Sequence, residues 1–587
     1  MKAPFHDALK AGVLGAVVVI FAAMTGMIEN FDGLNLIGEQ VTLALVLMGV
    51  PPLIAAYVAT RPRLVAAGIR GLVPRTAALA GLVTGLTTSV VVSAALGVVE
   101  LLGVDRIRPV FTSVSPTLIE IMQFGKGWAA GSAILIAGGA VLGLIGGASR
   151  GVAARIRRPV VIGFGVTLVM ALLQRIVPTI LFELGTESDW LYSPVTLGLT
   201  WLGAILVFVV SARATALWSA RGQNLRDRVE GMEQGRRATR AVVLAALVLG
   251  LIALPQLAGS IISEILGSVG IYVLLGLGLN IVVGYSGLLD LGYVAFFSVG
   301  AYFLALLTGA SLVAVLGTAE PAFSADLGFY GAVPLVVLIA AFVGVMIGGP
   351  VLRLRGDYLA IVTLGFGEIA RVLVTSEWLK PLVGGAQGMR NVTPATILGY
   401  DFRDPQHFYY LVLAFCLAAV YVSVRLAGSR VGRAWNAMRE DEQVAEATGV
   451  STVKYKLLAF AMGGAIGCLG GALFAVKVGT VQPDSFTILV SITALAVVVL
   501  GGMGSVPGVV VGALVLIGLP GLLSQLEQYR LLIYGAVLVA IMILRPQGLI
   551  PNVRRMRELR EEERAQDAWA RGEAGEPATV GAEAEGA

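Results

Sequence analysis

Few side chains in this sequence carry charge within apolar surroundings, and Glu368 and Arg371 are the clearest pair. They stand three residues apart within the apolar stretch 358–374. On a helix this spacing puts both on one face, where they can neutralise each other. Charges inside a membrane span are costly and mark functional positions by default. We therefore expect either a functional pair or a structural ion pair near a helix end.

A second polar group interrupts the apolar run 278–293, which also contains several glycines. Irregular backbone at membrane depth is tolerated only where it is buried in protein or lines a wet cavity. The alternative is that the glycines allow close helix packing while the polar groups bond to neighbouring backbone. The residues predicted to line a passage are Asn280, Tyr285, Ser286, Gly287 and Tyr293, together with Glu368 and Arg371.

The sequence offers little for catalysis or metal binding. Its only histidines are His6 and His407, and its only cysteines, Cys416 and Cys468, lie in apolar segments. These four residues form no ligand pattern with metal-site spacing. No Gly-x-x-x-x-Gly-Lys-Ser/Thr sequence occurs, so the chain is not expected to bind ATP in the P-loop manner. We predict no catalytic residue, no metal and no cofactor on this chain.

The composition indicates a membrane protein. Of the 587 residues, 57% are hydrophobic and only 13% are charged, unlike soluble domains of this length. A spanning helix needs about 20 mainly apolar residues, which allows about sixteen such stretches here. The expected fold is all-α, a polytopic transmembrane helical bundle with Gly-interrupted helices in its core.

Composition changes along the chain suggest four parts. Residues 1–210 form a membrane extension of about six helices, and 211–240 form a basic cytoplasmic connector. Residues 241–550 form a core of about ten helices, and 551–587 form a charged, largely disordered cytoplasmic tail. Arginine-rich loops alternate with acidic ones, which puts both termini in the cytoplasm. The net charge of +5 follows from this topology signal, so it does not indicate a nucleic-acid partner.

Several motifs follow one another in the second half. Two of them are Gly384-Gly-Ala-Gln-Gly-Met389 and Val498-Val-Leu-Gly-Gly-Met-Gly-Ser505, and three longer ones occupy 278–302, 352–371 and 431–449. In sequence and order they closely resemble the branched-chain amino acid ABC transporter permeases of LivM type. The resemblance covers about residues 240–551 and does not extend to residues 1–239.

The resemblance implies a subunit of an importer in the bacterial inner membrane that carries branched-chain or other hydrophobic amino acids. The implied partners are two ABC ATPase subunits, which bind the ATP, a second permease subunit of LivH type, and a periplasmic or lipid-anchored substrate-binding protein. High substrate affinity in the membrane passage is not required if a separate binding protein selects the substrate.

The segment 430–450 is the predicted contact with an ATPase subunit. It has no Gly or Pro from Ala434 to Ala447, so we expect one short helix that ends at Gly449. It resembles the Glu-Ala-Ala…Gly coupling loop of ABC importers, with Thr448 in place of the third small residue. The predicted coupling residues are Arg433, Trp435, Arg439, Glu440, Asp441, Glu446, Ala447 and Gly449.

Other functions remain open on the sequence alone. An ion-coupled secondary transporter of a small amphiphilic solute would explain the Gly-broken helices and sparse charges equally well. A related urea or amide permease of the ABC type is a further alternative. A membrane-embedded enzyme is disfavoured because no catalytic cluster is found.

Overall fold

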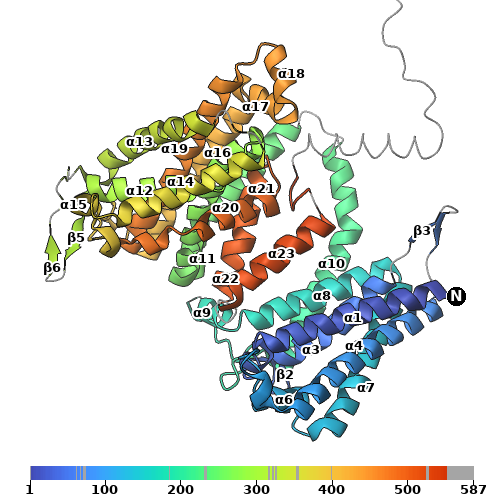
Figure 1. Ribbon diagram of the computed structural model, residues 1–587. Helices are drawn as coiled ribbons and strands as arrows, with labels where there is room; N and C mark the ends of the chain where they lie inside the picture. Colours follow the sequence, from blue (N-terminus) through green and yellow to red (C-terminus); the bar gives the residue numbers. More distant parts are fainter. Residues whose placement is uncertain are drawn as a thin grey trace, which may run out of the picture. The chain divides into compact units, whose positions relative to one another are not determined.

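The computed structural model consists of two compact units, Met1–Leu247 and Val248–Ala587. The described residues are 2–551, except for 61–62, 66–67, 71–73, 184, 231–234, 315–316, 320, 322, 324, 326, 352–353, 355, 398–399, 524–527 and 546. The predicted tail 551–587 therefore lies almost wholly outside them. Figure 1 shows both units as helical bundles.

The chain is an all-α membrane protein with small sheets, but the expected sixteen spans are not found. In the described part, nine helices are long and apolar enough to cross a membrane, or ten if the bent pair of α8 (Ala154–Leu172) and α9 (Ile176–Glu183) counts as one span. Five further apolar helices have only 10–17 residues. Glycines, prolines and π-helical turns interrupt these stretches, so an apolar run on the sequence does not always give a full-length helix.

Among the described residues, the first unit is built from ten α-helices that end before Leu247, with two short strand pairs and one 3-10 turn. Its elements are α1 (Lys2–Met24), α2 (Met27–Asn30), β1 (Asn35–Ile37), β2 (Val41–Thr42), α3 (Leu43–Ala59), β3 (Arg63–Val65), β4 (Gly68–Arg70), α4 (Pro74–Leu102), α5 (Val104–Ile107), α6 (Pro116–Met122), α7 (Gly127–Ala148), η1 (Ser149–Gly151), α8 (Ala154–Leu172), α9 (Ile176–Glu183) and α10 (Trp201–Glu230). Strands β1 and β2 pair antiparallel, as do β3 and β4.

Close backbone contact joins α4 to α7. A Cβ added to Gly81 would overlap the carbonyl oxygen of Gly143, and one added to Gly85 would overlap that of Gly139. In lipid no hydrophobic force drives helices together, so such small-residue contacts supply the packing energy. Thr88 Oγ1 donates a hydrogen bond of 2.9 Å to the Gly12 carbonyl and so joins α4 to α1. The first unit is thus a tightly packed bundle in its own right.

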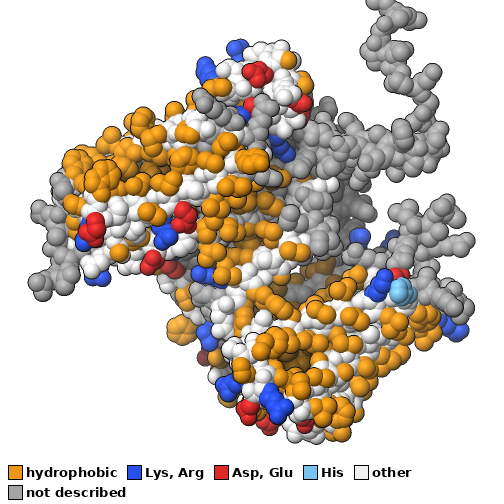
Figure 2. Space-filling model, viewed as in Figure 1, with side chains coloured by type: hydrophobic (Ala, Val, Ile, Leu, Met, Phe, Trp, Pro, Cys, Tyr) orange, Lys and Arg blue, Asp and Glu red, His pale blue; other side chains and the backbone are white. Residues whose placement is uncertain are grey.

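An apolar groove of about 550 Å³ runs between α1 and α3. Small residues such as Gly15 and Ala55 form part of its lining, with Leu, Val and Ile side chains around them. Figure 2 shows that hydrophobic side chains cover much of the visible surface of the molecule. This surface is the kind that faces lipid hydrocarbon.

The second unit holds the remaining elements. They are α11 (Gly235–Leu279, which begins in the first unit), η2 (Asn280–Tyr285), α12 (Val294–Leu307), β5 (Ser311–Ala314), β6 (Gly317–Ala319), α13 (Gly328–Val351), α14 (Asp357–Thr375), α15 (Lys380–Val383), η3 (Gly385–Gln387), β7 (Met389–Arg390), β8 (Thr396–Ile397), β9 (Tyr400–Asp401), α16 (Pro405–Gly428), α17 (Arg430–Glu440), α18 (Glu442–Ala447), α19 (Thr452–Val478), β10 (Thr480–Val481), η4 (Pro483–Ser485), α20 (Ile488–Gly501), α21 (Val506–Ala513), η5 (Leu514–Gly518), α22 (Leu519–Leu522) and α23 (Arg530–Leu544).

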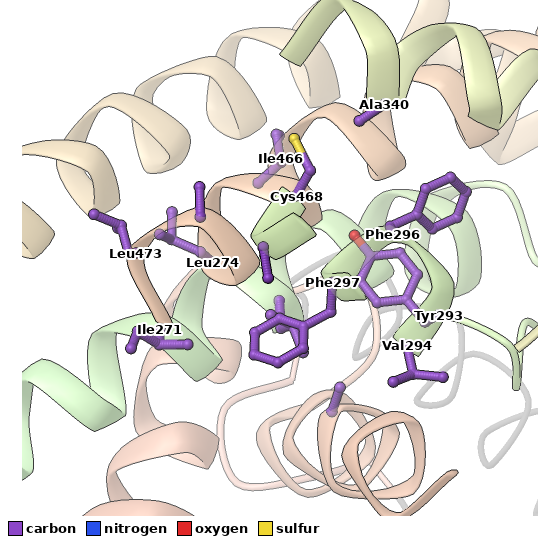
Figure 3. Close-up of a cluster of buried hydrophobic side chains, with 14 of the residues drawn as sticks. Ile271, Leu274, Tyr293, Val294, Phe296, Phe297, Ala340, Ile466, Cys468 and Leu473 are labelled. Atoms are coloured by element: carbon purple, nitrogen blue, oxygen red, sulfur yellow. The ribbon is translucent and has the colours of Figure 1, made fainter. Parts of the chain in front are cut away.

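The core of the second unit surrounds α12. This helix has 14 residues, a length of about 21 Å, which is shorter than the roughly 30 Å hydrocarbon core of a bilayer. Its Phe296 and Phe297 belong to the same buried cluster as Leu274 of α11 and Ile466 of α19 (Figure 3). A short helix with irregular ends is tolerated in a membrane when protein encloses it in this way.

A four-stranded sheet lies beside the helices of the second unit, with the strand order β10-β7-β5-β6. All three of its pairings are antiparallel. Strand β5 follows α12 and β10 follows α19. The sheet therefore connects the C-terminal ends of these two core helices. Strands β8 and β9 form a separate antiparallel pair.

Candidate functional site

The π-helical turn that follows α11 forms the centre of the candidate site. Helix α11 changes into the π-helix η2 at Asn280, and η2 ends at Tyr285, before the loop that leads to α12. All six residues of η2 are buried. Single π-helical turns inside α-helices are rare and occur often at functional sites.

Asn280 fixes one end of η2. Its Oδ1 accepts a hydrogen bond of 2.8 Å from the backbone N–H of Gly504. Because an N–H group only donates, the amide must present its oxygen there. Its Nδ2 is buried and has no hydrogen-bond partner among the described residues. Asn280 therefore combines a structural contact with an unused donor.

The residues that follow Asn280 differ in exposure. Tyr285 and Ser286 are buried, and the Ser286 hydroxyl donates a 2.6 Å hydrogen bond to the Val282 carbonyl. Gly287 is exposed and has a φ of +73°, a region that favours glycine. Of the predicted lining residues in this segment, Gly287 is thus the one at the surface of the chain.

Tyr293 contacts α19 and α12 in this structure. It is fully buried, and its hydroxyl donates a 2.6 Å hydrogen bond to the Gly463 carbonyl of α19. Its ring lies 5.5 Å from that of Phe296 in a tilted arrangement. The sequence prediction of a lining role did not include this contact, because it joins residues 170 positions apart.

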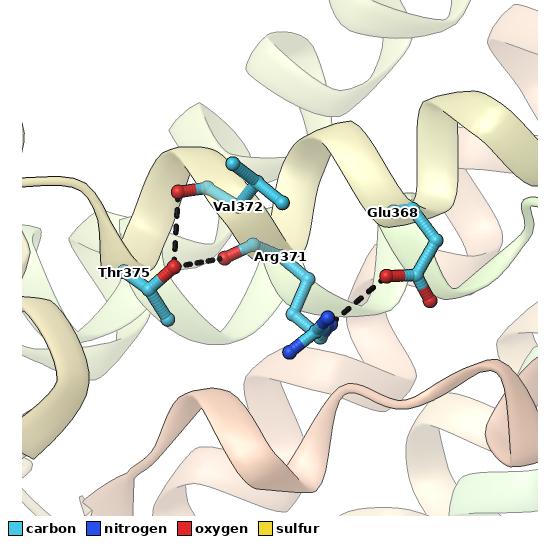
Figure 4. Close-up of polar contacts among 4 residues, drawn as sticks. All are labelled: Glu368, Arg371, Val372 and Thr375. Atoms are coloured by element: carbon cyan, nitrogen blue, oxygen red, sulfur yellow. Dashed lines mark hydrogen bonds and ion pairs between the residues drawn. The ribbon is translucent and has the colours of Figure 1, made fainter.

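Glu368 and Arg371 form the expected ion pair on α14, with 3.0 Å between Oε2 and Nε (Figure 4). Their side chains are 42% and 40% exposed. The pair therefore lies on the surface of the second unit. The contribution of this ion pair to stability depends on whether water, lipid or protein surrounds it, because water screens exposed pairs and lipid or protein does not.

Thr363, also on α14, was not singled out by the sequence. Its side chain is buried and accepts a 3.1 Å hydrogen bond from the Leu291 N–H in the loop after η2. Asp290 in the same loop accepts a 2.9 Å bond from the Gly292 N–H. Only its place in the motif 352–371 could have drawn attention to Thr363. The loop after η2 is therefore held by α14.

The predicted coupling segment forms two helices, so the expectation of one helix from Ala434 to Ala447 is wrong. Helix α17 ends at Glu440 and α18 begins at Glu442. Between them, Asp441 Oδ1 accepts hydrogen bonds from the Gln443 and Val444 N–H groups at 2.8 and 3.0 Å. Aspartate is a strong N-cap, so it starts a new helix where the absence of Gly and Pro suggested continuity.

One face of this pair of helices is buried. Trp435 is fully buried and its Nε1 donates a 2.8 Å hydrogen bond to the Tyr455 carbonyl of α19. Met438 lies on the same face and is 6% exposed. Arg439 is partly buried, and its Nη1 donates a 2.7 Å hydrogen bond to the Gly284 carbonyl of η2.

The opposite face is exposed. It carries charged groups and small residues, and Gly449 ends the segment with a φ of +88°. The apolar side chain of Val444 is 59% exposed among them. The exposed members of the predicted set are Arg433, Glu440, Asp441, Glu446, Ala447 and Gly449. Trp435 and Arg439 face inward instead and attach the segment to the rest of the unit.

Among the described residues, no group of three or more His, Cys, Asp or Glu side chains could hold a metal ion. Lys477, near the other end of α19, pairs with Glu264 of α11 at 2.9 Å and also bonds to Ser268. The Glu264 side chain is 52% exposed. This contact joins the end of α19 to α11 and offers no catalytic arrangement.

Comparison with known proteins matches the second half of the chain. Residues 261–543 match a family model described as the branched-chain amino acid transport system permease component. The chain is 39% identical over 291 residues to the high-affinity branched-chain amino acid transport system permease protein LivM of Salmonella typhimurium. That alignment covers 46% of this chain and 65% of the relative. The resemblance seen in the motifs is confirmed over this region.

Two further relatives agree with this match. LivM of Escherichia coli is 39% identical, again over 46% of this chain and 65% of the relative. The permease protein LivH of Escherichia coli is 30% identical over 137 residues, which cover 23% of this chain and 44% of LivH. The family match begins at residue 261, after the whole first unit. No solved structure matches the chain significantly. The second half of the chain is thus LivM-like.

Proposed function

We propose that this chain is the membrane-spanning permease subunit of an ABC importer for branched-chain or other hydrophobic amino acids. The observation that carries the proposal is the 39% identity to LivM over 291 residues. The region that matches the family model, residues 261–543, contains both η2 and the α17–α18 pair with its exposed charged face. ATP hydrolysis on separate ATPase subunits would drive transport.

The passage would run beside η2. A zwitterionic aliphatic amino acid needs polar groups for its head and apolar walls for its side chain. The buried Nδ2 of Asn280 supports this position, because an unpaired buried donor costs about 1–3 kcal/mol and calls for an explanation. Tyr285, Ser286, Gly287 and Tyr293 would border the passage, as would the Glu368–Arg371 pair.

The α17–α18 pair would dock in a groove of an ATPase subunit. A short helical element with one buried and one exposed face suits such a contact. The other partners would be a second ATPase subunit, a second permease of LivH type, and a periplasmic or lipid-anchored binding protein. The location would be the bacterial inner membrane with both termini in the cytoplasm, as the Arg-rich loops favour.

Residues 1–210 would form an N-terminal membrane extension of about six helices, with 211–240 as a cytoplasmic connector. The compact packing of α4 on α7 supports an independent bundle. Sixteen crossings would require the shorter apolar helices to cross the membrane as well. Some of these crossings would then consist of helices interrupted by breaks of the kind seen at η2.

Reconstitution tests the proposal directly. The chain is placed in liposomes with the two ATPase subunits, the LivH-type permease and the binding protein, and uptake of labelled leucine is measured with and without ATP. We expect uptake only when ATP and the ATPase subunits are present. Leucine uptake by the chain alone under an ion gradient would instead identify a secondary transporter. ATP-driven uptake of urea without leucine would identify the amide permease.

A further inference from the structure

One side chain connects the exposed coupling segment to the broken helix. Arg439 stands near the end of α17, and its Nη1 lies 2.7 Å from the Gly284 carbonyl oxygen, 155 residues away in the sequence. Gly284 is the second-last residue of η2. The carbonyls at the end of a helix lack partners within it, and a cation is favoured there. Arg439 thus supplies a hydrogen-bond donor to a carbonyl at the end of the π-helix.

The same side chain also packs against the residue that follows η2. A Cβ added to Gly287 would lie 2.8 Å from Cγ of Arg439. The aliphatic part of Arg439 therefore rests on Gly287 while its guanidinium holds Gly284. One arginine contacts the backbone on both sides of the turn that ends η2.

Arg439 is itself held in place by α17. Trp435, one turn earlier, is fully buried and bonded to the Tyr455 carbonyl. Beyond Arg439, Glu442 of α18 forms a 2.6 Å ion pair with Lys456 of α19. The coupling segment is thus attached to the first turns of α19 through Trp435 and Glu442, and Arg439 lies between these two residues in the sequence.

The other end of η2 is attached to a different element. Asn280 Oδ1 accepts the Gly504 N–H bond, and Gly504 lies in the turn between α20 and α21. The π-helix is therefore held by Arg439 at its end and by the Gly504 turn at its start. A displacement of α17 would act on η2 against this second attachment.

We propose that Arg439 is the positioning residue through which movement of the α17–α18 pair changes the π-helix η2. The inference rests on the proposed function and specifies how the ATPase contact reaches the passage. A π-helical turn is a rare alternative to the α-helix that occurs often at functional sites, and its hydrogen-bond register is the element that we expect to change between two arrangements. Pulling Arg439 away would leave the Gly284 carbonyl without this partner.

The test uses the complete transporter in liposomes with the variants Arg439→Ala and Arg439→Lys. The control is Arg425→Ala, an exposed arginine on α16 that bonds to Tyr421 on its own helix. The ATP hydrolysis rate, leucine uptake, ATPase co-purification and melting temperature are measured for each. We expect Arg439→Ala to lower the uptake per ATP about tenfold, the size of one lost charged hydrogen bond, while the ATPase subunits still co-purify. Arg439→Lys should recover part of the lost uptake per ATP, and Arg425→Ala should match the wild type.

A second variant approaches the contact from the other side. Gly287→Ala places a methyl group against Arg439 and is also strained by its positive φ. In the Arg439→Ala background the 2.8 Å overlap with Cγ is gone, while the strain and the contacts with Cβ and Cα of residue 439 at 3.2 and 3.3 Å remain. Gly287→Ala should therefore reduce uptake per ATP less there than in the wild type. Additive effects of the two changes would overturn the proposal, as would normal uptake per ATP in Arg439→Ala. If the wild-type complex itself shows no ATP-driven leucine uptake, the proposed function fails instead, and the two failures are distinct.

Discussion

Lys456 Nζ lies 2.6 Å from Glu442 Oε1, and the lysine side chain is only 5% exposed. Lys456 belongs to the first turns of α19, one of the long apolar helices, whereas Glu442 begins α18. A buried cation is retained only when it is paired, because an unpaired one is costly. The ion pair therefore fixes the coupling segment to the helix that packs on α12.

The first prediction concerns this pair. Glu442→Gln should lower the free energy of unfolding by about 1–3 kcal/mol, because it leaves Lys456 buried without its charge partner. The double variant with Lys456→Gln should be less destabilised than the sum of the singles. Thermal unfolding in detergent measures both. Lys380→Gln is the control, since its pair with Glu377 is exposed and is worth about 0–1 kcal/mol. A normal melting curve for Glu442→Gln would contradict the interpretation.

The second prediction concerns the α4–α7 contact of the first unit. Gly85→Leu should lower the free energy of unfolding of this unit by about 1–3 kcal/mol, because the new side chain would meet the backbone of α7. Gly138→Leu on α7 is the matched control, since no atom lies within 4 Å of its Cβ position. Protease resistance and thermal unfolding of the purified chain distinguish the two. Equal stability of both variants would show that α4 and α7 are not packed this closely.

The third prediction concerns the Glu368–Arg371 pair. If a second subunit or lipid covers this face, Glu368→Gln should reduce uptake more than the double variant Glu368→Gln with Arg371→Gln, because the single change leaves one uncompensated charge. Uptake and folding are measured for both singles and the double. Small, independent effects would place the pair in water, as its 40% exposure in the isolated chain permits.

The fourth prediction concerns the first unit as a whole. A chain that begins near Arg240 should still assemble with its partners and transport leucine, with reduced stability, because the LivM-like match begins only at residue 261. Co-purification of the ATPase subunits and uptake in liposomes are measured beside the full chain. Complete loss of transport in a well-folded truncated complex would assign the first unit a direct role.

Local signals in the sequence were sufficient for part of this architecture. Hydropathy identified a helical membrane protein, and the i,i+3 spacing of Glu368 and Arg371 predicted their contact. The sequence offers about sixteen apolar stretches, whereas the described residues contain nine or ten helices that pass as spans, because an apolar run does not reveal a break such as η2 or the short length of α12. The break at Asp441 was a readable signal, since an aspartate before Glu442 is a typical N-cap.

The contacts that organise the candidate site could not be read in this way. Arg439 reaches Gly284 across 155 residues, and Asn280 reaches Gly504 across 224. Such contacts depend on how distant helices pack, and no local periodicity encodes that. Tyr293 illustrates the same limit, because its hydroxyl partner on α19 lies 170 residues away in the sequence.

The last prediction concerns the exposed face of the α17–α18 pair. Glu440 and Asp441 are both exposed, but Asp441 also caps α18, so the two charges need different substitutions. Glu440→Lys reverses a charge without removing a cap, whereas Asp441→Asn removes a charge and keeps a side chain that caps nearly as well. Asp441→Ala would remove both and serves as the comparison for the cap.

We expect Glu440→Lys to weaken ATPase co-purification or to uncouple ATP hydrolysis from uptake, because charge reversal at a docking face costs binding energy. Asp441→Asn should act in the same direction but less strongly, with unchanged melting, while Asp441→Ala should also lose about 1 kcal/mol of stability with the cap. A bulky residue at Gly449, which has φ +88°, should disturb the end of α18 and give the same uncoupling. The salt dependence of co-purification separates a charge effect from a folding effect, because only the former is screened. Normal ATPase binding and normal uptake in Glu440→Lys would place the ATPase contact on another part of the chain.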